Sequence, residues 1–184
     1  MQFLQELWLP IVVSGVAVFI LSALAWTALP HHRTEWRRLD GEDAVLDALR
    51  ASGVTPGLYT FPYAMGPKEL GQPEIAAKFN RGPVGYITVG RTGVRGMGPM
   101  MLQSLTFYWV VALFVAYIAS HTLAADAEYL AVFRVVGTLG LMAFAFASVP
   151  ESIWFGRPWR SFLLQCADAL VYSLVMAGIF GWLW

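Results

Sequence analysis

The stretch ESIWFGRPWRS, residues 151–161, places three charged side chains in a tail that is otherwise almost wholly apolar. They are Glu151, Arg157 and Arg160, and they stand among two tryptophans, a phenylalanine and a proline. A chain that crosses a bilayer keeps charge out of the hydrocarbon and exposes it where the backbone turns back in water. We therefore predict that this stretch is a hairpin connection between two transmembrane helices.

The composition indicates a membrane protein. Hydrophobic residues make up 58% of the chain and charged residues only 13%, whereas about a quarter of the residues of a soluble domain are charged. The 12 basic and 12 acidic side chains cancel, so the net charge gives no attraction to nucleic acid. The expected partners are the lipid bilayer and other membrane subunits or further copies of the chain, and no nucleic acid.

Four apolar runs are long enough to cross a bilayer, which needs about 20 residues of helix. They cover residues 7–29, 102–123, 129–149 and 161–184. The first run follows MQFLQE, which contains no lysine or arginine, so we interpret it as a retained helix with Pro10 in its first turn and not as a signal peptide. The predicted fold is an all-α integral membrane protein, a four-transmembrane-helix bundle with a small α+β cytoplasmic cap. The predicted division is 1–30, 31–100 and 101–184.

The cap is expected to contain two helices and two strands. LDGEDAVLDALRAS, residues 39–52, is typical of an amphipathic helix with Asp40 as its N-cap. PGLYTFPY and GPVGYITVGR, residues 56–63 and 82–91, favour strands that pair, and QPEIAAKFNRG, residues 72–82, favours a helical turn or two. The arginine-rich lead RTGVRGMGPM, residues 91–100, either contacts a lipid headgroup or is a plain flexible connection.

Arginines gather on one side of the predicted spans, at the cytoplasmic interface. They are Arg33, Arg37, Arg38, Arg91, Arg95, Arg157 and Arg160. The segments on the other side, residues 1–6, 124–128 and 181–184, contain no lysine or arginine. Because positive charge near helix ends favours the cytoplasm, both termini are predicted to lie outside.

Polar side chains recur at helical spacing within the spans. The stripes are Ser161, Gln165, Asp168 and Tyr172; Gln103, Thr106, Val110, Tyr117 and His121; and Arg134, Thr138, Leu141, Ala145 and Ser148. Residues three, four and seven apart share one face of a helix, and lipid contact would leave charge in hydrocarbon. We expect all three stripes to face the bundle interior. Glycines and alanines between residues 137 and 147 are expected to let helices approach closely.

The two charged residues inside the spans need partners. For Asp168 the candidates are Gln103, Tyr172, Arg157 and Arg160, in a structural hydrogen bond or in a proton or ion site. For Arg134 one hypothesis is an ion pair with Asp126, Glu128 or the carboxylate of Trp184. The alternative for Arg134 is that its side chain extends to the outer interface.

A shared metal or bis-histidine haem is not expected. His31 and His32 follow the first span, while His121 lies near the outer end of the second. Adjacent side chains point in different directions on a helix or a strand, so we expect His31 and His32 to be solvated at the interface. Cys166 is the single cysteine. No metal or cofactor is predicted, and a bound lipid remains an open alternative.

At YLAVFRVVGT, SIWFGRPWR, AGIFGWLW and the HH after the first span, the chain resembles a group of small bacterial inner-membrane proteins of similar length. The resemblance covers nearly the full chain. It implies a multi-pass protein of the bacterial cytoplasmic (inner) membrane with four helices. It implies no activity, so no residue role is transferred.

Three classes of function fit these observations. The first is a non-catalytic accessory or scaffolding subunit of a larger membrane complex, such as a respiratory or photosynthetic one, and we favour it. The alternative is a small oligomeric transporter or channel that uses Asp168 on an inward polar stripe. A membrane enzyme with Glu151 or His32 as acid or base ranks last, because nothing in the spacing singles these residues out.

Overall fold

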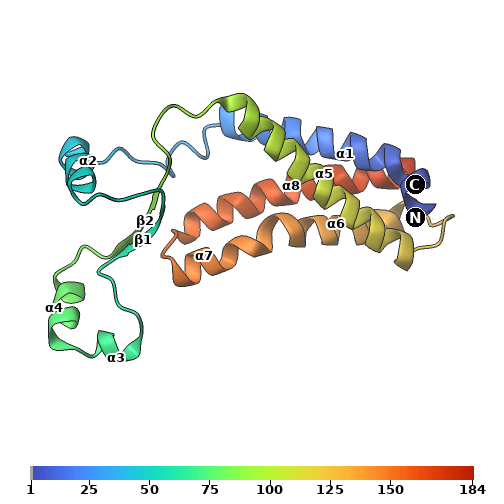
Figure 1. Ribbon diagram of the computed structural model, residues 1–184. Coiled ribbons are helices and arrows are strands. Elements are labelled where there is room, and N and C mark those ends of the chain that lie inside the picture. The colour runs from blue at the N-terminus through green and yellow to red at the C-terminus, as the bar shows by residue number, and fades with distance from the viewer. Residues whose placement is uncertain (1) are drawn as a thin grey trace. The chain divides into compact units, whose positions relative to one another are not determined.

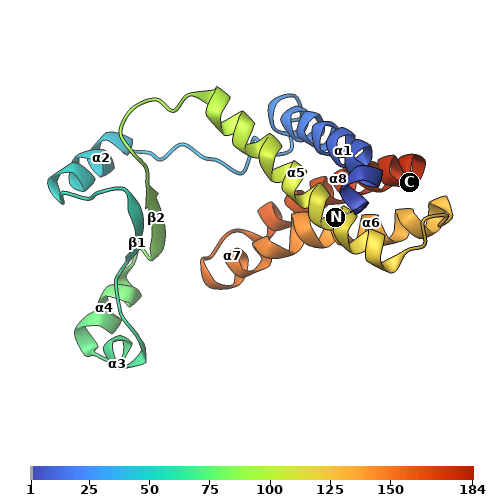
Figure 2. The ribbon, with the colours of Figure 1, turned by 45° about the vertical axis from the view of Figure 1, so that its right-hand side comes forward.

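A computed structural model describes residues 2–184 of the chain and divides them into two compact units. The first unit comprises residues 2–36, 96–153 and 157–184, and the second comprises residues 37–95 with 154–156. The helices of the first unit are α1 (Gln2–Thr27), α5 (Met97–Thr122), α6 (Tyr129–Ala145), α7 (Val149–Trp154) and α8 (Trp159–Leu183), with the 3₁₀ turn η1 (Phe146–Ser148) between α6 and α7. Figures 1 and 2 show α1, α5, α6 and α8 packed along one another.

Four helical stretches are long and apolar enough to cross a membrane. They are Phe3–Thr27, Met97–Thr122, Tyr129–Trp154 and Trp159–Leu183, each of 25 or 26 residues. At about 1.5 Å per residue each one exceeds the ~30 Å of a hydrocarbon core. The chain is therefore a mostly helical, multi-pass membrane protein, as predicted. Both ends of the chain lie at one end of the bundle (Figure 1), here named the terminus end. The opposite end, where α1 ends and α8 begins, is named the loop end.

Three helix boundaries differ from the prediction. The first helix begins at Gln2, so Pro10 lies inside α1 and not in its first turn. The second span begins at Met97, with Pro99 in its first turn, where a proline removes no intrahelical hydrogen bond. The third span continues beyond residue 149 through η1 and α7. Pro150 cannot donate a backbone hydrogen bond into the preceding turn, which accounts for the irregular helix there.

The bundle interior is closely packed where α6 meets α8. Gly140 is buried, and a β-carbon added to it would lie 3.1 Å from the Cβ and 3.3 Å from the Cα of Ser173. Both distances are shorter than ordinary van der Waals contact, so the two backbones approach closely because residue 140 has no side chain. At Gly137 the added atom would meet Ala177 at 3.4 Å. The expectation that small residues pack helices in this segment is confirmed at both positions.

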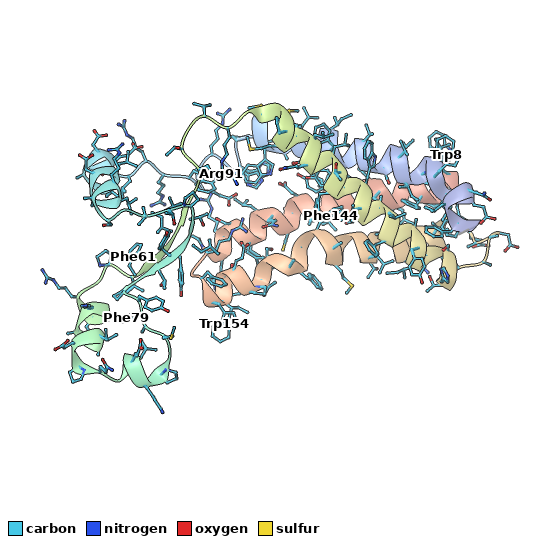
Figure 3. All side chains as sticks on the ribbon, in the orientation of Figure 1. Trp8, Phe61, Phe79, Arg91, Phe144 and Trp154 are labelled. Atoms are coloured by element: carbon cyan, nitrogen blue, oxygen red, sulfur yellow. The ribbon has the colours of Figure 1, made fainter. Side chains whose placement is uncertain are left out.

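The outer surface of the bundle is mostly apolar, as contact with lipid requires. Trp8, Ile20 and Leu24 of α1 are about half exposed, and Phe114 and Leu163 are more so. Figure 3 shows Trp8 projecting away from the helices near the terminus end. A tryptophan ring at a helix end suits the boundary between hydrocarbon and water.

The second unit contains the predicted helices and strands. Its elements are α2 (Glu42–Ala51), β1 (Gly57–Phe61), α3 (Pro67–Leu70), α4 (Pro73–Arg81) and β2 (Gly85–Val89). The strands pair antiparallel, with Gly57 opposite Val89 and Phe61 opposite Gly85, so the expected hairpin is confirmed. The cap of α2 is Gly41 and not Asp40. Gly41 has a φ of 76°, a left-handed conformation that glycine adopts readily.

Candidate functional site

The chain turns sharply after α1 and brings two histidines against α8. Residues 31–35 form turns and neither a helix nor a strand. Their backbone hydrogen bonds run from the Arg33 amide to the Pro30 carbonyl, at 3.1 Å, and from the Glu35 amide to the His32 carbonyl, at 3.0 Å. This tight geometry lets the His31 and His32 rings approach to 4.1 Å between centroids. The expectation that the two side chains point apart is therefore wrong, because it assumed a regular helix or strand.

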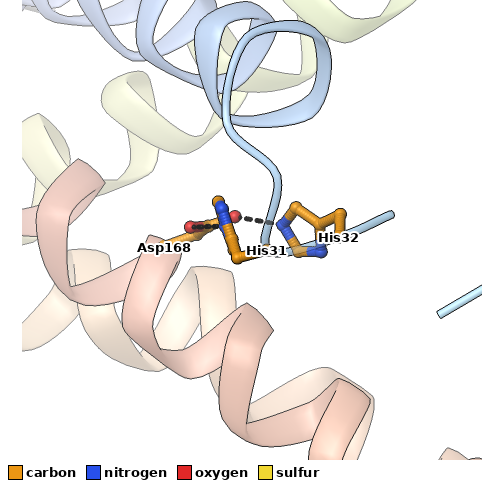
Figure 4. A group of neighbouring side chains, drawn as sticks. All are labelled: His31, His32 and Asp168. Atoms are coloured by element: carbon orange, nitrogen blue, oxygen red, sulfur yellow. Dashed lines mark hydrogen bonds and ion pairs between the residues drawn. The ribbon is translucent and has the colours of Figure 1, made fainter. Parts of the chain in front are cut away.

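Both imidazole rings bond to one carboxylate on α8. Nε2 of His31 lies 2.9 Å from Oδ1 of Asp168, and Nε2 of His32 lies 2.7 Å from Oδ2 (Figure 4). The residues are 137 and 136 positions apart in the chain. These contacts tie the turn after α1 to the loop-end half of α8, so Asp168 is satisfied by two groups that were not among its predicted partners.

His32 is the most enclosed member of the site. Its side chain is only 4% exposed, and its ring stacks on Trp26 with centroids 4.0 Å apart and planes 4° apart. Nδ1 bonds to a carboxylate oxygen of Glu35, while Nε2 bonds to Asp168. Ionised carboxylates only accept hydrogen bonds, so a ring that bonds both donates from both nitrogens and is positively charged. Stacking on an indole face stabilises that charge. The expectation of a solvated His32 is wrong.

Glu35 is held in place from α8 and from the connection before it. The Glu35 side chain is 8% exposed, receives a hydrogen bond from Ser161 and lies 3.9 Å from Nη2 of Arg157. Nη1 of Arg157 donates to Oε2 of Glu151 at 2.8 Å. Beside this pair, Nη1 of Arg160 donates to the hydroxyl of Thr34 at 2.9 Å. The charges of the stretch 151–161 thus secure the turn that carries the histidines.

Opposite charges shift two pKa values in this cluster. Burial alone would lower the pKa of His32, but hydrogen bonds and charges from Glu35 and Asp168 outweigh it and raise that pKa above its ordinary 6.5. Burial alone would raise the pKa of Glu35, yet hydrogen bonds from His32 and Ser161 lower it below its ordinary 4.5. The positive charge of Arg157 adds to the lowering.

We expect the bundle to be most stable between pH 4.5 and pH 6.5, which are the ordinary pKa values of Glu35 and His32. Because folding lowers the pKa of Glu35, this residue stabilises the fold above pH 4.5, and that contribution is lost as the pH falls through the pKa of Glu35 in the folded protein. Because folding raises the pKa of His32, this residue stabilises the fold below pH 6.5, and that contribution is lost as the pH rises through the pKa of His32 in the folded protein. Thermal unfolding in detergent with a chelator, from about pH 4 to pH 9, measures both arms. The groups facing His32 are Glu35, Asp168 and His31. In His32→Gln the alkaline loss should disappear, and stability that rises steadily from pH 6.5 to pH 8 would contradict the assignment.

Further polar groups lie deeper in the bundle beside Asp168. Tyr172, one turn along α8, is 7% exposed, and its buried hydroxyl lies beside the Asp168 carboxylate without a hydrogen bond of good geometry among the described residues. The buried side-chain oxygen of Gln165 likewise lacks a partner in the described chain. The rings of Tyr108 and Phe144 contact the ring of Tyr172 at 6.4 Å and 6.0 Å. The predicted stripe Ser161, Gln165, Asp168 and Tyr172 does face the interior.

Beyond this polar layer the buried side chains are mostly apolar towards the terminus end, and the buried hydroxyls of Ser14 and Ser173 donate to carbonyls of their own helices. The buried side chains there include Val18, Val115, Val132, Val136, Met176 and Phe180. They belong to all four spanning helices and form one cluster. In the described part of the chain, the polar cluster is therefore confined to the loop-end half of the bundle.

The other two predicted stripes differ from the structure. Gln103, Thr106, Val110, Tyr117 and His121 are all exposed on α5, and the buried face of α5 consists of Val111, Ala112, Val115, Ala116 and Ala119. On α6, Arg134 and Thr138 are exposed, while Ala145 and Ser148 farther along are buried. The hydroxyls of Thr106 and Thr138 donate to carbonyls four residues back, at 2.9 Å and 2.8 Å. These threonines need no partner from a neighbouring helix.

The predicted ion pair of Arg134 is not found among residues 2–184. Its guanidinium lies within 4.0 Å of no described carboxylate, and the side chain is exposed near the start of α6. Trp184 instead uses its indole nitrogen, which donates to the Ala124 carbonyl at 3.1 Å.

The predicted interface arginines are divided between the two units. Arg33, Arg157 and Arg160 belong to the first unit, and Arg37, Arg38, Arg91 and Arg95 belong to the second. A lipid headgroup as their ligand stays a prediction.

An open groove lies beside the site at the loop end and is lined by two of the residues that contact His32, Trp26 and Glu35. Its volume is about 450 Å³, and its lining consists of Trp26, Glu35, Trp36, Glu151, Arg157, Pro158 and Ser161. The side chain of His31 is 26% exposed and that of Asp168 is 14% exposed. His31 and Asp168 are therefore partly open to solvent, whereas His32 is enclosed.

The ligand atoms of His31, His32 and Asp168 all lie within 4.8 Å of one another. Two imidazoles and one carboxylate, supplied by two separate segments, make a donor set that transition metals use. Sequence reasoning missed this group, although it contained one usable signal: a histidine pair and an intramembrane aspartate were both predicted near the same ends of their helices.

Comparisons with protein-family profiles, with curated proteins and with solved structures found no match to this chain. The geometry of the chain therefore carries the functional argument.

Proposed function

We propose that the chain is a non-catalytic accessory or scaffolding subunit of a larger membrane complex, such as a respiratory or photosynthetic one. The observation that carries the proposal is the outward position of Gln103 on α5 and Arg134 on α6. Both side chains are exposed, and neither forms a hydrogen bond or an ion pair among the described residues. Unpaired polar groups on a lipid-facing surface are costly. Contact with the helices of a partner removes that cost.

The alternative, a small oligomeric transporter or channel that uses Asp168, is favoured by the inward stripe of α8. A conducting path also needs polar or water-accessible groups through the rest of the bundle. Within the described chain, the interior between Asp168 and the terminus end is filled by residues such as Val136, Met176 and Phe180. A single chain therefore supports binding at one end better than passage across the membrane.

The proposed location is the bacterial cytoplasmic (inner) membrane, with both termini on the periplasmic side. It is supported by the distribution of arginine, since the loop end carries Arg33, Arg157 and Arg160. The connection at the terminus end, residues 124–128, contains Asp126 and Glu128 and no basic side chain. Short loops rich in arginine favour the cytoplasm.

Site-specific photo-crosslinking in native membranes tests the proposal. A photoreactive amino acid placed at position 103 or 134 is expected to crosslink to a different polypeptide, because a partner covers those side chains. The matched control is position 20, where Ile20 is 51% exposed on the apolar face of α1. It should react with lipid and give no defined protein adduct. Purification in mild detergent and mass spectrometry would then identify the partner.

Two results would contradict the accessory role. One is the absence of any protein adduct from positions 103 and 134. The other is an adduct to a second copy of this chain, together with purification as a homogeneous assembly of that chain alone. The second result would favour the oligomeric transporter.

A further inference from the structure

We propose that His31, His32 and Asp168 bind one divalent first-row transition-metal ion, with zinc the best fit. This departs from the sequence-based expectation of no metal, and it does not rest on the proposed accessory role. Two of the side chains come from the turn after α1 and the third, Asp168, from the first half of α8 (Figure 4). An ion bound there would link these two segments at the loop end of the bundle.

The donor atoms select the class of ion. Imidazole nitrogen suits zinc, copper, iron and nickel, whereas magnesium and calcium prefer sites made wholly of oxygen. Two nitrogens and one carboxylate oxygen therefore favour a transition metal. Zinc sites that keep an open position commonly use three protein ligands of this kind.

The present distances are close to those that a bound ion requires. Ligands about 2.0 Å from a tetrahedral zinc lie ~3.3 Å from one another. The two nitrogen–oxygen distances, 2.9 and 2.7 Å, end on different oxygens of Asp168, and the three ligand atoms lie within 4.8 Å of one another, so one ion requires both imidazole nitrogens to turn towards a single carboxylate oxygen. Rotation of the partly exposed His31 and of the Asp168 carboxylate supplies this movement without displacing a helix.

The surroundings of His32 resemble those of a metal ligand. A ligating histidine usually bonds its second ring nitrogen to a carboxylate, which fixes the ring and directs the other lone pair at the metal. Glu35 bonds Nδ1 of His32 in this way, and Ser161 and Arg157 hold Glu35. Trp26 fixes the plane of the ring. The carboxylate beside the ligand is thus already in place.

A fourth position remains for water or an exogenous ligand. The buried hydroxyl of Tyr172 lies beside the Asp168 carboxylate on the same face of α8, without a hydrogen bond of good geometry among the described residues. It is 93% removed from solvent, given its exposure of 7%, and it can hydrogen-bond to a metal-bound water. The ion would take the place of the protons that Asp168 now shares with the two imidazoles, and the water would give Tyr172 a second polar neighbour.

The test uses the full chain in detergent, purified with an affinity tag that contains no histidine and stripped with a chelator. Titration with Co²⁺ is expected to give one equivalent per chain and the visible d–d absorption of a low-coordinate site. Zn²⁺ should displace Co²⁺, because it binds such sites more tightly. Mg²⁺ and Ca²⁺ in excess should not. Fe²⁺, added without oxygen, should displace it less well than Zn²⁺.

Variants identify the ligands. His31→Gln replaces the imidazole ligand by an uncharged amide and Asp168→Asn replaces the carboxylate by an amide of the same shape, and each should abolish the Co²⁺ absorption. Glu35→Gln should weaken Zn²⁺ binding by about 10- to 100-fold, as loss of a carboxylate beside a ligand does. The control is His121→Gln, since His121 is exposed on α5 and bonds within its own helix. That variant should bind as the parent chain does. Circular dichroism establishes that each variant keeps its helix content.

Two outcomes would overturn the site. The first is that the stripped parent chain shows no Co²⁺ absorption and binds less than one equivalent of Zn²⁺ at about 10 µM free ion, a concentration at which a functional site of this donor set is occupied. Alternatively, His31→Gln and Asp168→Asn would bind Zn²⁺ as tightly as His121→Gln does. The Co²⁺ result on the parent chain decides the matter even if a ligand variant fails to fold.

Discussion

Replacing His32 by phenylalanine is expected to lower the free energy of unfolding of the metal-free bundle by about 3–5 kcal/mol, as for other buried ion pairs that lose one partner. Phenylalanine preserves a ring that can stack on Trp26, but it donates no hydrogen bond. Glu35 and Asp168, which are 8% and 14% exposed, would then lose the group that lies between them. Two poorly solvated carboxylates without the imidazolium destabilise the turn after α1. Reversible unfolding in detergent with a chelator measures the loss.

The control for this substitution is His31→Phe. His31 makes one bond to Asp168 and is 26% exposed, so its replacement should cost about 1 kcal/mol or less. Asp168→Asn in the His32→Phe background should recover part of the stability, because it removes one of the two like charges. The difference between the stability change of the double variant and the sum of the two single changes measures the coupling between His32 and Asp168. Equal destabilisation by His32→Phe and His31→Phe would show that the position of His32 between Glu35 and Asp168 adds nothing to the free energy of unfolding.

The spanning helices could be predicted from the sequence because their signal is local. Each apolar run is long enough to cross hydrocarbon, and a backbone in hydrocarbon must satisfy its hydrogen bonds within the helix. The errors lie at the ends of the runs. Met97 and Gly98 extend α5 although the residues before 102 resemble a loop, and Pro150 interrupts the third span without ending it.

The direction in which polar side chains face could be predicted only for α8. Asp168 is charged and must leave the lipid, so its stripe turns inward. Thr106 of α5 and Thr138 of α6 do not share this requirement, since their hydroxyls bond to their own helices. Small residues such as Ala112 and Ala116 form the buried face of α5, because close approach of helices stabilises a bundle in lipid.

The candidate site could not be predicted, because it depends on a turn and on a contact across the chain. His31 and His32 lie 137 and 136 residues from Asp168. Their convergence follows from the turns at residues 31–35, and nothing in the periodicity of the flanking helices encodes it. The identity of each residue was visible in the sequence, but their common location was not.

Gly140→Leu is expected to lower the free energy of unfolding by about 3 kcal/mol, the upper range for an overpacked core. The added β-carbon would lie 3.3 Å from the Cα of Ser173. A backbone atom cannot rotate away as a side chain can, so α6 and α8 must separate. The matched control is Ala143→Leu, which enlarges an exposed residue on the same helix and should change stability by less than about 0.5 kcal/mol. Thermal unfolding of both variants in one detergent compares them. Equal melting temperatures would mean that the close approach at Gly140 is not what holds α6 against α8.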